Sequence, residues 1–280
     1  MFVVCLCIGS ECALSWRWNN RLSGPLRFAS AGSGSEGNAL LVEAGATRIL
    51  IDCGFATREL RQRLAALNCA LESLSAIVVT HEHSDHANGV ARLARQLGIP
   101  VWLTHGTLRM LGVDTFDGVE LRILNGGMRV AIDALEVEAF TVPHDAREPV
   151  QFVIGNGHHR LGILTDAGCS TPHIEACLSG CHALVLECNH ERELLENGPY
   201  PAGLKRRVAS RVGHLDNETA AHILRNIDCT KLQHIVAAHL SKQNNTPEHA
   251  RRALSAALNC SADWIGIANQ ESGFGWRELL

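Results

Sequence analysis

The sequence contains no long apolar segment, and this absence excludes a membrane-spanning helix. None of its apolar runs reaches about 18 residues, the length that a helix needs to cross a bilayer. The N-terminal stretch is apolar, but no basic residue precedes it and no small-residue cleavage pattern follows it. It is therefore a poor signal peptide, and we expect a cytoplasmic protein.

Regular cysteine spacing is also absent. The eleven cysteines are odd in number, and no two of them stand in CxxC spacing. Neither a disulfide framework nor a zinc ribbon is indicated, so a reducing compartment is the simpler interpretation. The apolar share of 46% and the charged share of 19% are those of an ordinary globular protein.

The chain of 280 residues is long for one domain but within the size that a single α/β domain reaches. We see no internal repeat and no linker, and therefore expect one compact domain over residues 26–280. The preceding residues 1–25 form an extension to which we assign no role, and it contains Cys5, Cys7, Cys12, Trp16 and Trp18.

The chain has little excess charge of either sign. Its 25 Lys and Arg against 29 Asp and Glu give a net charge of −4, so nothing attracts the whole molecule to nucleic acid or to an anionic membrane. A polyanionic partner would need a local basic patch. The candidate patch consists of Lys205, Arg206, Arg207 and Arg211, which also fit a solvated helix face.

A nucleotide-binding loop is absent as well. The glycine-rich stretch GSGSEGN at residues 32–38 lacks the Gly-Lys-Ser/Thr ending that a P-loop requires. We therefore expect no nucleotide cofactor, and we interpret this stretch as a tight connection between strands. Asn38 is a candidate for lining a nearby cleft.

Short β-branched apolar runs recur along the chain, and each ends in a residue that can bind a metal. Strands that end in this way bring their last side chains to one edge of a sheet, where open α/β folds place their ligands. The five runs are Arg48–Ile51 before Asp52, Ala76–Thr80 before His81, Val137–Val142 before Pro143 and His144, Leu161–Thr165 before Asp166, and Ile235–Ala238 before His239.

Amphipathic spacing predicts helices between these strands. Apolar residues are spaced at helical intervals after Asp52 and again after the histidines, where Ser84 or Asp85 is a possible N-cap. The predicted helices follow from Leu60, Leu64 and Leu67, from Val90, Leu93, Ala94 and Leu97, from residues 218–225 and from residues 247–258.

The segment THEHSDH at residues 80–86 concentrates four potential metal ligands in six positions. Side chains two apart in an extended loop point the same way, so His81 and His83 can bind one ion. Asp85 and His86 point elsewhere and are placed for a second. Imidazole and carboxylate suit zinc, iron or manganese. The alternative is a solvated acidic loop at a helix start, but the number of ligands favours metal.

This segment resembles the signature of the metallo-β-lactamase superfamily, and Asp52, His144, Asp166 and His239 follow in that superfamily's order. The resemblance implies an α+β fold of the αββα type, a four-layer sandwich of two mixed β-sheets flanked by helices. It also implies two divalent ions per chain, with zinc expected first and manganese or iron as alternatives.

The same resemblance implies a role for each ligand. The first ion is held by His81, His83 and His144 and the second by Asp85, His86 and His239, with Asp166 bridging both together with a hydroxide. Asp52 resembles the acid that orients the ligand loop without binding metal.

Two features narrow the choice within the superfamily. The bridging residue is Asp166 where several true β-lactamases have cysteine, and Cys169 is three residues late and is expected to be a packed thiol. The gaps of residues 145–165 and 167–213 are too short for the inserted arm or the extra domain of the RNA-processing members. A compact hydrolase of phosphodiesters or thioesters remains.

The stretch GHLDNETA at residues 213–220 resembles a motif of the phosphodiesterase members. It predicts His214 beside the metals, where it would polarise a phosphate oxygen or protonate a leaving alkoxide, although His214 can also simply cap a helix. His190, after a predicted strand, is a further candidate for the cleft, whereas His158 and His159 are expected in a hairpin turn.

The blocks FASAGSGSEGNALLVE, LVLECNHE, NGPYPAGLKRRVASRVGHL and HLSKQNNTPE together resemble the YycJ (WalJ) family, which is associated with 5′ to 3′ exonuclease activity on DNA. The implied mechanism is hydrolysis of a phosphodiester by a metal-bridging hydroxide, with Asp85 or Asp166 accepting the proton. DNA is a more natural substrate than RNA under this resemblance. Two alternatives stay open: a hydrolase of thioesters or cyclic phosphodiesters, and a weakly catalytic metalloprotein that binds nucleic acid.

Overall fold

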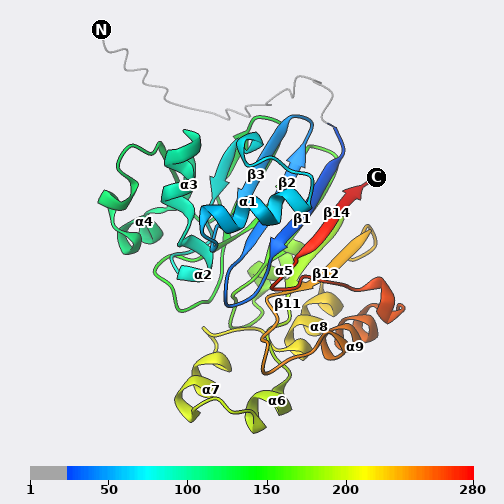
Figure 1. The fold of residues 1–280 in the computed structure, drawn as a ribbon. Helices are drawn as coiled ribbons and strands as arrows, with labels where there is room; N and C mark the ends of the chain where they lie inside the picture. The colour runs from blue at the N-terminus through cyan, green and yellow to red at the C-terminus, as the bar shows by residue number, and fades with distance from the viewer. Residues whose placement is uncertain (1–23) are drawn as a thin grey trace, which may run out of the picture.

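The computed structural model describes residues 24–280 of the chain. The expected N-terminal extension, with its three cysteines and two tryptophans, therefore lies almost wholly outside the described residues. Within the described part, the chain folds into two seven-stranded sheets and the helices around them (Figure 1).

The first sheet has the strand order β14-β1-β2-β3-β4-β5-β6. Neighbours from β14 to β3 run antiparallel, and neighbours from β3 to β6 run parallel. The C-terminal strand thus pairs with the first one, which places the two ends of the domain side by side (Figure 1). Its strands are β1 (Leu26–Gly32), β2 (Ala39–Ala44), β3 (Thr47–Ile51), β4 (Ala76–Val78), β5 (Val101–Thr104), β6 (Leu121–Leu124) and β14 (Phe274–Leu279).

The second sheet has the order β13-β12-β11-β10-β9-β8-β7. From β7 to β10 the neighbours are antiparallel, and from β10 to β13 they are parallel. Both sheets are therefore mixed in the same way, and β3 and β10 occupy equivalent positions. The strands are β7 (Arg129–Ile132), β8 (Leu135–Thr141), β9 (Val150–Gly155), β10 (Arg160–Leu164), β11 (Ala183–Glu187), β12 (His234–Ala238) and β13 (Gly266–Ile267).

Helices cover the outer faces of both sheets. The helices of the described residues are α1 (Thr57–Ala66), α2 (Ser84–Ala87), α3 (Val90–Leu97), α4 (His105–Leu111), α5 (Pro172–Leu178), α6 (Arg192–Asn197), α7 (Ala202–Val208), α8 (Asn217–Asn226) and α9 (Pro247–Leu258), with short 3₁₀ turns at Leu71–Ser73, Val113–Phe116 and Ala262–Trp264. In Figure 1, α6 and α7 extend from the lower end of the molecule.

Three apolar cores separate the layers. One lies between the sheets and includes Phe28 and Phe152. A second joins α1 and α3 to the first sheet, and a third joins α5, α8 and α9 to the second sheet. Alternate strand residues thus face the inter-sheet core or a helix layer, as period-two side-chain geometry requires. The four-layer αββα sandwich expected from the sequence is confirmed.

The predicted helices form with one difference. The segment after the histidines does not begin with a side-chain cap at Ser84 or Asp85. It forms a single turn, α2, and restarts as α3 after Gly89. The physical reason is that the Asp85 carboxylate faces His86 and His239 and is not available to cap the helix.

One smaller expectation is also confirmed. His158 and His159 lie in the β9–β10 hairpin turn, where their backbone amides donate to Asn156 Oδ1. The eight described cysteines are all free thiols. In the described part of the chain, no helix has the length and hydrophobicity needed to cross a membrane.

We predict that Phe152→Ala destabilises the domain by about 3–5 kcal/mol, because Phe152 is fully buried between the sheets and its loss leaves a cavity. Chemical denaturation of the chelator-treated protein, followed by circular dichroism, measures this loss. Met110→Ala is the control, since Met110 is 61% exposed and its change should stay within about 0.5 kcal/mol. A Phe152→Ala protein as stable as the control would contradict the inter-sheet placement.

Candidate metal centre

The candidate site residues follow strand ends at one edge of the two sheets. Asp52 follows β3, Asp166 follows β10 and His239 follows β12. All three adopt left-handed backbone conformations, with φ of 60°, 54° and 55°. Such conformations cost about 1–3 kcal/mol for residues other than glycine and gather at functional sites. The chain therefore turns sharply where each strand ends, which brings these side chains to a common edge.

Three histidines form the first potential ligand group. His83 Nδ1 lies 3.0 Å from His81 Nε2 and 3.3 Å from His144 Nε2. His144 Nδ1 is 3.0 Å from the carbonyl oxygen of Gly213. Because a carbonyl only accepts hydrogen bonds, Nδ1 carries the proton and the Nε2 lone pair of His144 faces the group. Converging imidazole lone pairs of this kind suit a cation.

A second potential group lies beside the first. Asp85, His86 and His239 offer ligand atoms that lie within 4.8 Å of one another. Asp85 Oδ2 is 3.3 Å from His86 Nε2 and 3.4 Å from His239 Nε2. Asp166 Oδ2 lies 2.9 Å from the same His86 nitrogen. Asp166 also groups with His81, so its carboxylate stands between the two groups.

Asp52 holds the ligand loop from behind. Its Oδ1 accepts from the Thr80 amide at 2.8 Å, and its Oδ2 accepts from the Thr80 hydroxyl at 2.8 Å. The same Oδ2 lies 2.8 Å from His86 Nδ1. A carboxylate there fixes the proton on Nδ1 and turns Nε2 toward Asp166. Thr80 Oγ1 in turn contacts His81 Nδ1 at 2.9 Å, so one buried acid orients ligands of both groups.

Asn38 holds the loop from the other side. The backbone amide of Asn38 donates to the Asp85 carbonyl at 2.7 Å, and the side-chain nitrogen Nδ2 lies 3.1 Å from His86 Nε2. Gly54 permits this packing, because a Cβ there would lie 1.9 Å from the Asp85 carbonyl oxygen. Asn38 is only 7% exposed, so it positions ligands and does not offer an open surface for substrate.

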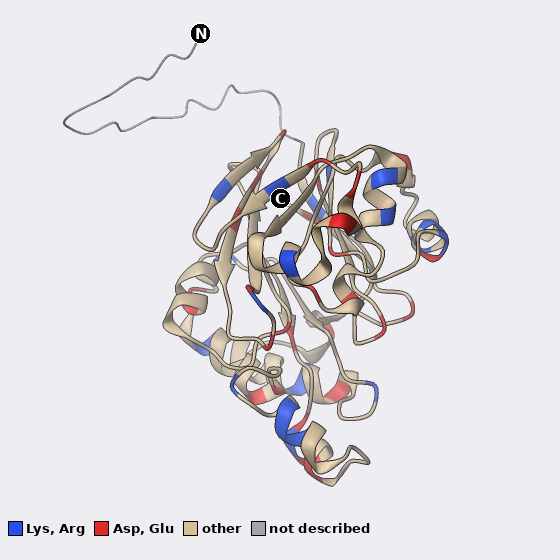
Figure 2. Cartoon of the chain, turned by 90° about the vertical axis from the view of Figure 1, so that its left-hand side faces the viewer, with Lys and Arg blue, Asp and Glu red and all other residues tan. Residues whose placement is uncertain are grey.

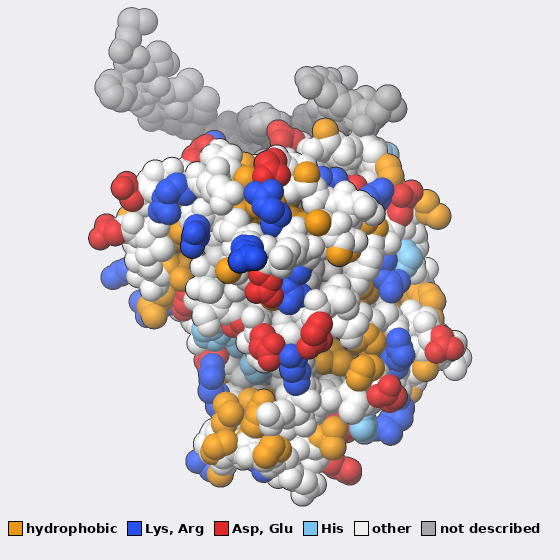
Figure 3. Space-filling view, in the orientation of Figure 1, with side chains coloured by type: hydrophobic (Ala, Val, Ile, Leu, Met, Phe, Trp, Pro, Cys, Tyr) orange, Lys and Arg blue, Asp and Glu red, His pale blue; other side chains and the backbone are white. Residues whose placement is uncertain are grey.

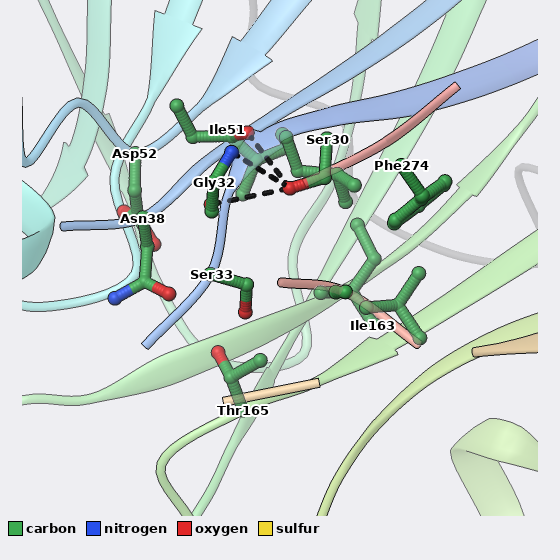
Figure 4. Close-up of a pocket in the computed structure, with 13 residues that line it drawn as sticks. Ser30, Gly32, Ser33, Asn38, Ile51, Asp52, Ile163, Thr165 and Phe274 are labelled. Carbon is green, nitrogen blue, oxygen red and sulfur yellow. Dashed lines mark hydrogen bonds between the residues drawn. The ribbon is translucent and has the colours of Figure 1, made fainter. Parts of the chain in front are cut away.

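A small cavity of about 30 Å³ lies behind these residues, lined by both sheets (Figure 4). Asp52 and Asn38 line it from the side of the site, and Ser33 and Thr165 point toward each other across it. Ser33 Oγ also accepts from the His239 amide at 3.0 Å. The glycine-rich connection between β1 and β2 therefore supports both ligand loops, as the interpretation of a tight connection near the site implied.

His214 lies against the second group and not in a capping position. Helix α8 is capped by Asp216, whose side chain accepts from the Thr219 amide. The His214 ring stacks on His239 with centroids 5.4 Å apart, and its Nδ1 is 3.2 Å from Asp166 Oδ1. The ring also lines the open cavity described below. The structure thus brings His214 to the site that the sequence predicted.

Glu187 is a site residue that sequence analysis missed. This fully buried acid ends β11, and its Oε1 lies 2.8 Å from His214 Nδ1. Its Oε2 accepts from the amides of Ala167 and Leu215 at 2.9 and 3.2 Å. Burial opposes its ionisation, but His214 outweighs this and lowers the pKa of Glu187 to about 2. The signal was present, because the apolar run before Glu187 is a sixth strand that ends in a potential ligand.

The charges of the site test whether metal ions fit. The acids Asp52, Asp85, Asp166 and Glu187 crowd one small region, and their ion-pair partners among residues 24–280 are all histidines. Asp166 Oδ2 is buried and lies 2.9 Å from His86 Nε2, but it accepts no hydrogen bond within the same residues because the proton of His86 faces Asp52 on Nδ1. Buried charges require pairing or metal coordination. The donor set and the unsatisfied oxygen therefore fit divalent cations.

The pKa values of the site histidines also reflect the nearby carboxylates. Burial would lower the pKa of His86, but Asp166 and Asp52 outweigh it and raise that pKa well above its ordinary value. Burial and His86 hold the pKa of His81 well below its ordinary value. Burial also lowers the pKa of His144. His81 and His144 therefore stay neutral near pH 7, which is the form that binds metal.

An open cavity of about 350 Å³ adjoins the centre. It is bounded by the candidate ligands on one side and by the α7 region on the other. Its lining includes His83, Asp85, Asp145, Asp166, Asn189, Tyr200, Leu204, Arg207, His214, His239 and Ser241. In Figure 3, histidine side chains are visible in the waist of the molecule, above the hydrophobic side chains of the lower lobe.

Only one residue of the candidate basic patch lines this cavity. Arg207 does so, and its Nε donates to Asp145 Oδ2 at 2.6 Å. Lys205 instead donates to the Glu196 carbonyl oxygen, which ties α7 to α6. Arg206 and Arg211 are exposed but lie outside the cavity lining. Figure 2 shows this basic segment on the helix at the lower end of the molecule.

Two other sequence candidates lie away from the cavity lining. His190 is 2% exposed and forms a β-bridge with Asp216, while its neighbour Asn189 lines the cavity instead. This placement does not favour contact between His190 and substrate. Cys169 is half-buried, and so is less enclosed than the packed thiol that we expected.

Comparison with known proteins gives the family. A family model described as "Beta-lactamase superfamily domain" matches residues 47–239. The exodeoxyribonuclease YycJ of Bacillus anthracis is 34% identical over 257 residues, which cover 91% of this chain and 93% of that protein. The exodeoxyribonuclease WalJ of Streptococcus pneumoniae serotype 2 is 30% identical over 245 residues, with coverage of 86% and 91%.

A solved structure shows the same fold at lower identity. The metallo-beta-lactamase fold protein YhfI from Bacillus subtilis superposes with a TM-score of 0.70 at 16% identity, covering 91% of this chain and 99% of that one. The family match spans more than half of the chain, and the two relatives align along most of it. The chain therefore belongs to the metallo-β-lactamase-fold superfamily of hydrolases and, within it, to the YycJ/WalJ family.

Proposed function

We propose that this protein is a dinuclear metal-dependent phosphodiesterase that acts on DNA as a 5′ to 3′ exonuclease. The observation that carries the proposal is the arrangement of two ligand groups around one shared carboxylate, Asp166. A two-metal site of this kind suits in-line displacement at phosphorus. The choice of DNA, and of the 5′ to 3′ direction, rests on membership of the YycJ/WalJ family, whose two aligned members are named exodeoxyribonucleases.

In this proposal seven side chains hold two divalent ions. His81, His83 and His144 would bind the first ion, and Asp85, His86 and His239 the second, with Asp166 between them. Nitrogen and carboxylate donors suit zinc first, and manganese or iron as alternatives. Asp52 orients the ligand loop from behind through His86 and Thr80. When bound, the ions would lower the pKa of the attacking water and neutralise charge on the phosphate.

The other steps belong to the protein's own side chains. Asp85 is partly exposed to the cavity and can accept the proton of the attacking water, and Asp166 is the alternative acceptor. His214 holds a proton on Nδ1 against the Glu187 carboxylate, which leaves Nε2 for the substrate. Burial would lower the pKa of His214, but Glu187 and Asp166 raise it well above its ordinary value. A cationic His214 would donate a proton to the leaving alkoxide.

We predict that the purified protein releases nucleotides from 5′-end-labelled DNA with Mn²⁺ or Zn²⁺ and that excess chelator stops the release. Single-stranded and duplex substrates should both be tested. Asp166→Asn should lose the activity, because it removes the charge that the two ligand groups share. His158→Ala is the control, since His158 is exposed in the β9–β10 hairpin and should leave activity unchanged. Equal activity of Asp166→Asn and wild type would refute the proposal.

We further predict that His83→Ala and His214→Ala fail in different ways. His83→Ala removes a nitrogen from the first group, so bound metal measured by mass spectrometry should fall together with activity. His214→Ala should keep its metal and lower kcat by about 10²–10⁴-fold, the usual contribution of a general acid. Loss of one ion from His214→Ala would instead make His214 a ligand. Turnover by His83→Ala with full metal content would contradict the ligand assignment.

A further inference from the structure

The open cavity beside the metal centre has two unlike walls. One part of its lining consists of candidate ligands, and another part consists of Tyr200, Leu204 and Val208, which lie in and just before α7. The volume of about 350 Å³ is at the lower end of the range of small-molecule sites, about 300–1,000 Å³. A cavity of this size admits one nucleotide but not a base pair with both its strands.

Tyr200 is the single tyrosine of the chain. Its ring belongs to none of the three apolar cores of the described residues. It is half-buried at the cavity wall, and its hydroxyl makes no hydrogen bond within residues 24–280. It stands between Pro199 and Pro201, and the residue before a proline is restricted to extended conformations. The ring is therefore presented by a stiff backbone, which reduces the entropy lost when a ligand binds.

The wall that carries Tyr200 is closely attached to the candidate ligands. The amide of His214 donates to the Val208 carbonyl at 2.9 Å. A Cβ at Gly213 would lie 2.2 Å from that same carbonyl, so only glycine permits this approach. The Gly213 carbonyl in turn accepts from His144. Helix α7 and the metal centre therefore share one short segment of backbone, which sets the width of the cavity.

We propose that Tyr200, supported by Leu204, is a stacking platform for the base of the terminal nucleotide whose phosphodiester is cleaved. Every base has a π-face, so an aromatic platform binds bases with little sequence preference. The base must leave its pairing partner to enter the cavity. This inference rests on the proposed nuclease function and deepens it, since it names what the enzyme recognises beyond the phosphate.

Arg207 fits the same nucleotide from the mouth of the cavity. Its Nε donates to Asp145, and its two terminal nitrogens have no hydrogen-bond partner among residues 24–280. A guanidinium suits a phosphate oxygen pair. With the base on Tyr200 and the adjoining phosphate on Arg207, the scissile bond would face the ligand wall. Tyr200 and Arg207 together would thus hold the nucleotide by its base and by its phosphate.

A double-mutant cycle between Tyr200 and the base tests the platform. The substrate is a duplex with one unpaired nucleotide at its labelled 5′ end, prepared with a normal terminal base or with an abasic terminal residue. Removal of the base should lower kcat/KM of the wild type about tenfold, which corresponds to about 1.4 kcal/mol and lies within the range for one stacked base. Tyr200→Ala should cause a similar loss with the normal base and no further loss with the abasic substrate.

Three controls separate stacking from a general structural role. Tyr200→Phe keeps the ring and should retain the wild-type preference for a base. Trp264→Ala removes a partly exposed aromatic side chain outside the cavity and should change nothing. Bound metal, measured by mass spectrometry, should be equal for wild type and Tyr200→Ala.

The outcomes distinguish the two proposals. Additive losses in the cycle, or an unchanged Tyr200→Ala, would overturn the platform while the nuclease function stands. Loss of bound metal from Tyr200→Ala together with its activity would give Tyr200 a structural role only and also overturn it. No release of nucleotides by the wild type under any metal would overturn the nuclease proposal, and the platform with it.

Discussion

The rest of the site depends on buried carboxylates whose ion-pair partners among residues 24–280 are all histidines. Asp52, Asp166 and Glu187 are each at most 3% exposed, and an isolated buried charge is too costly to persist without compensation. Each acid therefore sits at a strand end where backbone amides or imidazoles face it. This requirement explains why several histidines gather around these acids.

The two acids behind the ligands work in matching ways on the two sheets. Asp52 follows β3 and orients His86, and Glu187 ends β11 and orients His214. Each also accepts a backbone amide from the adjacent loop, Thr80 for one and Leu215 for the other. Imidazole direction and tautomer are thus set by atoms outside the ligand groups, as is common at metal sites.

Many of the site residues could be predicted from the sequence, because the patterns that identify them are local. An apolar β-branched run that ends in His or Asp predicts a side chain at a sheet edge, and His81, His144 and Asp166 all obey this rule. The same rule would have found Glu187, had it been applied to the run before it. The strand boundaries differed by only a few residues, since local propensity decides where a strand begins but pairing decides where it ends.

The sequence by itself determined the strand-end candidate ligands and the amphipathic helices, because each depends on residue type and spacing along a short stretch. The four-layer fold followed from the resemblance of these motifs to a known superfamily. Only the tertiary structure decided which neighbouring side chains face the cavity. It turned Asn189 inward and buried His190, directed Lys205 to α6 and Arg207 to the cavity, and placed Tyr200 opposite the ligands. These directions depend on how α7 and the His214 loop pack, and that packing joins segments that no local pattern relates.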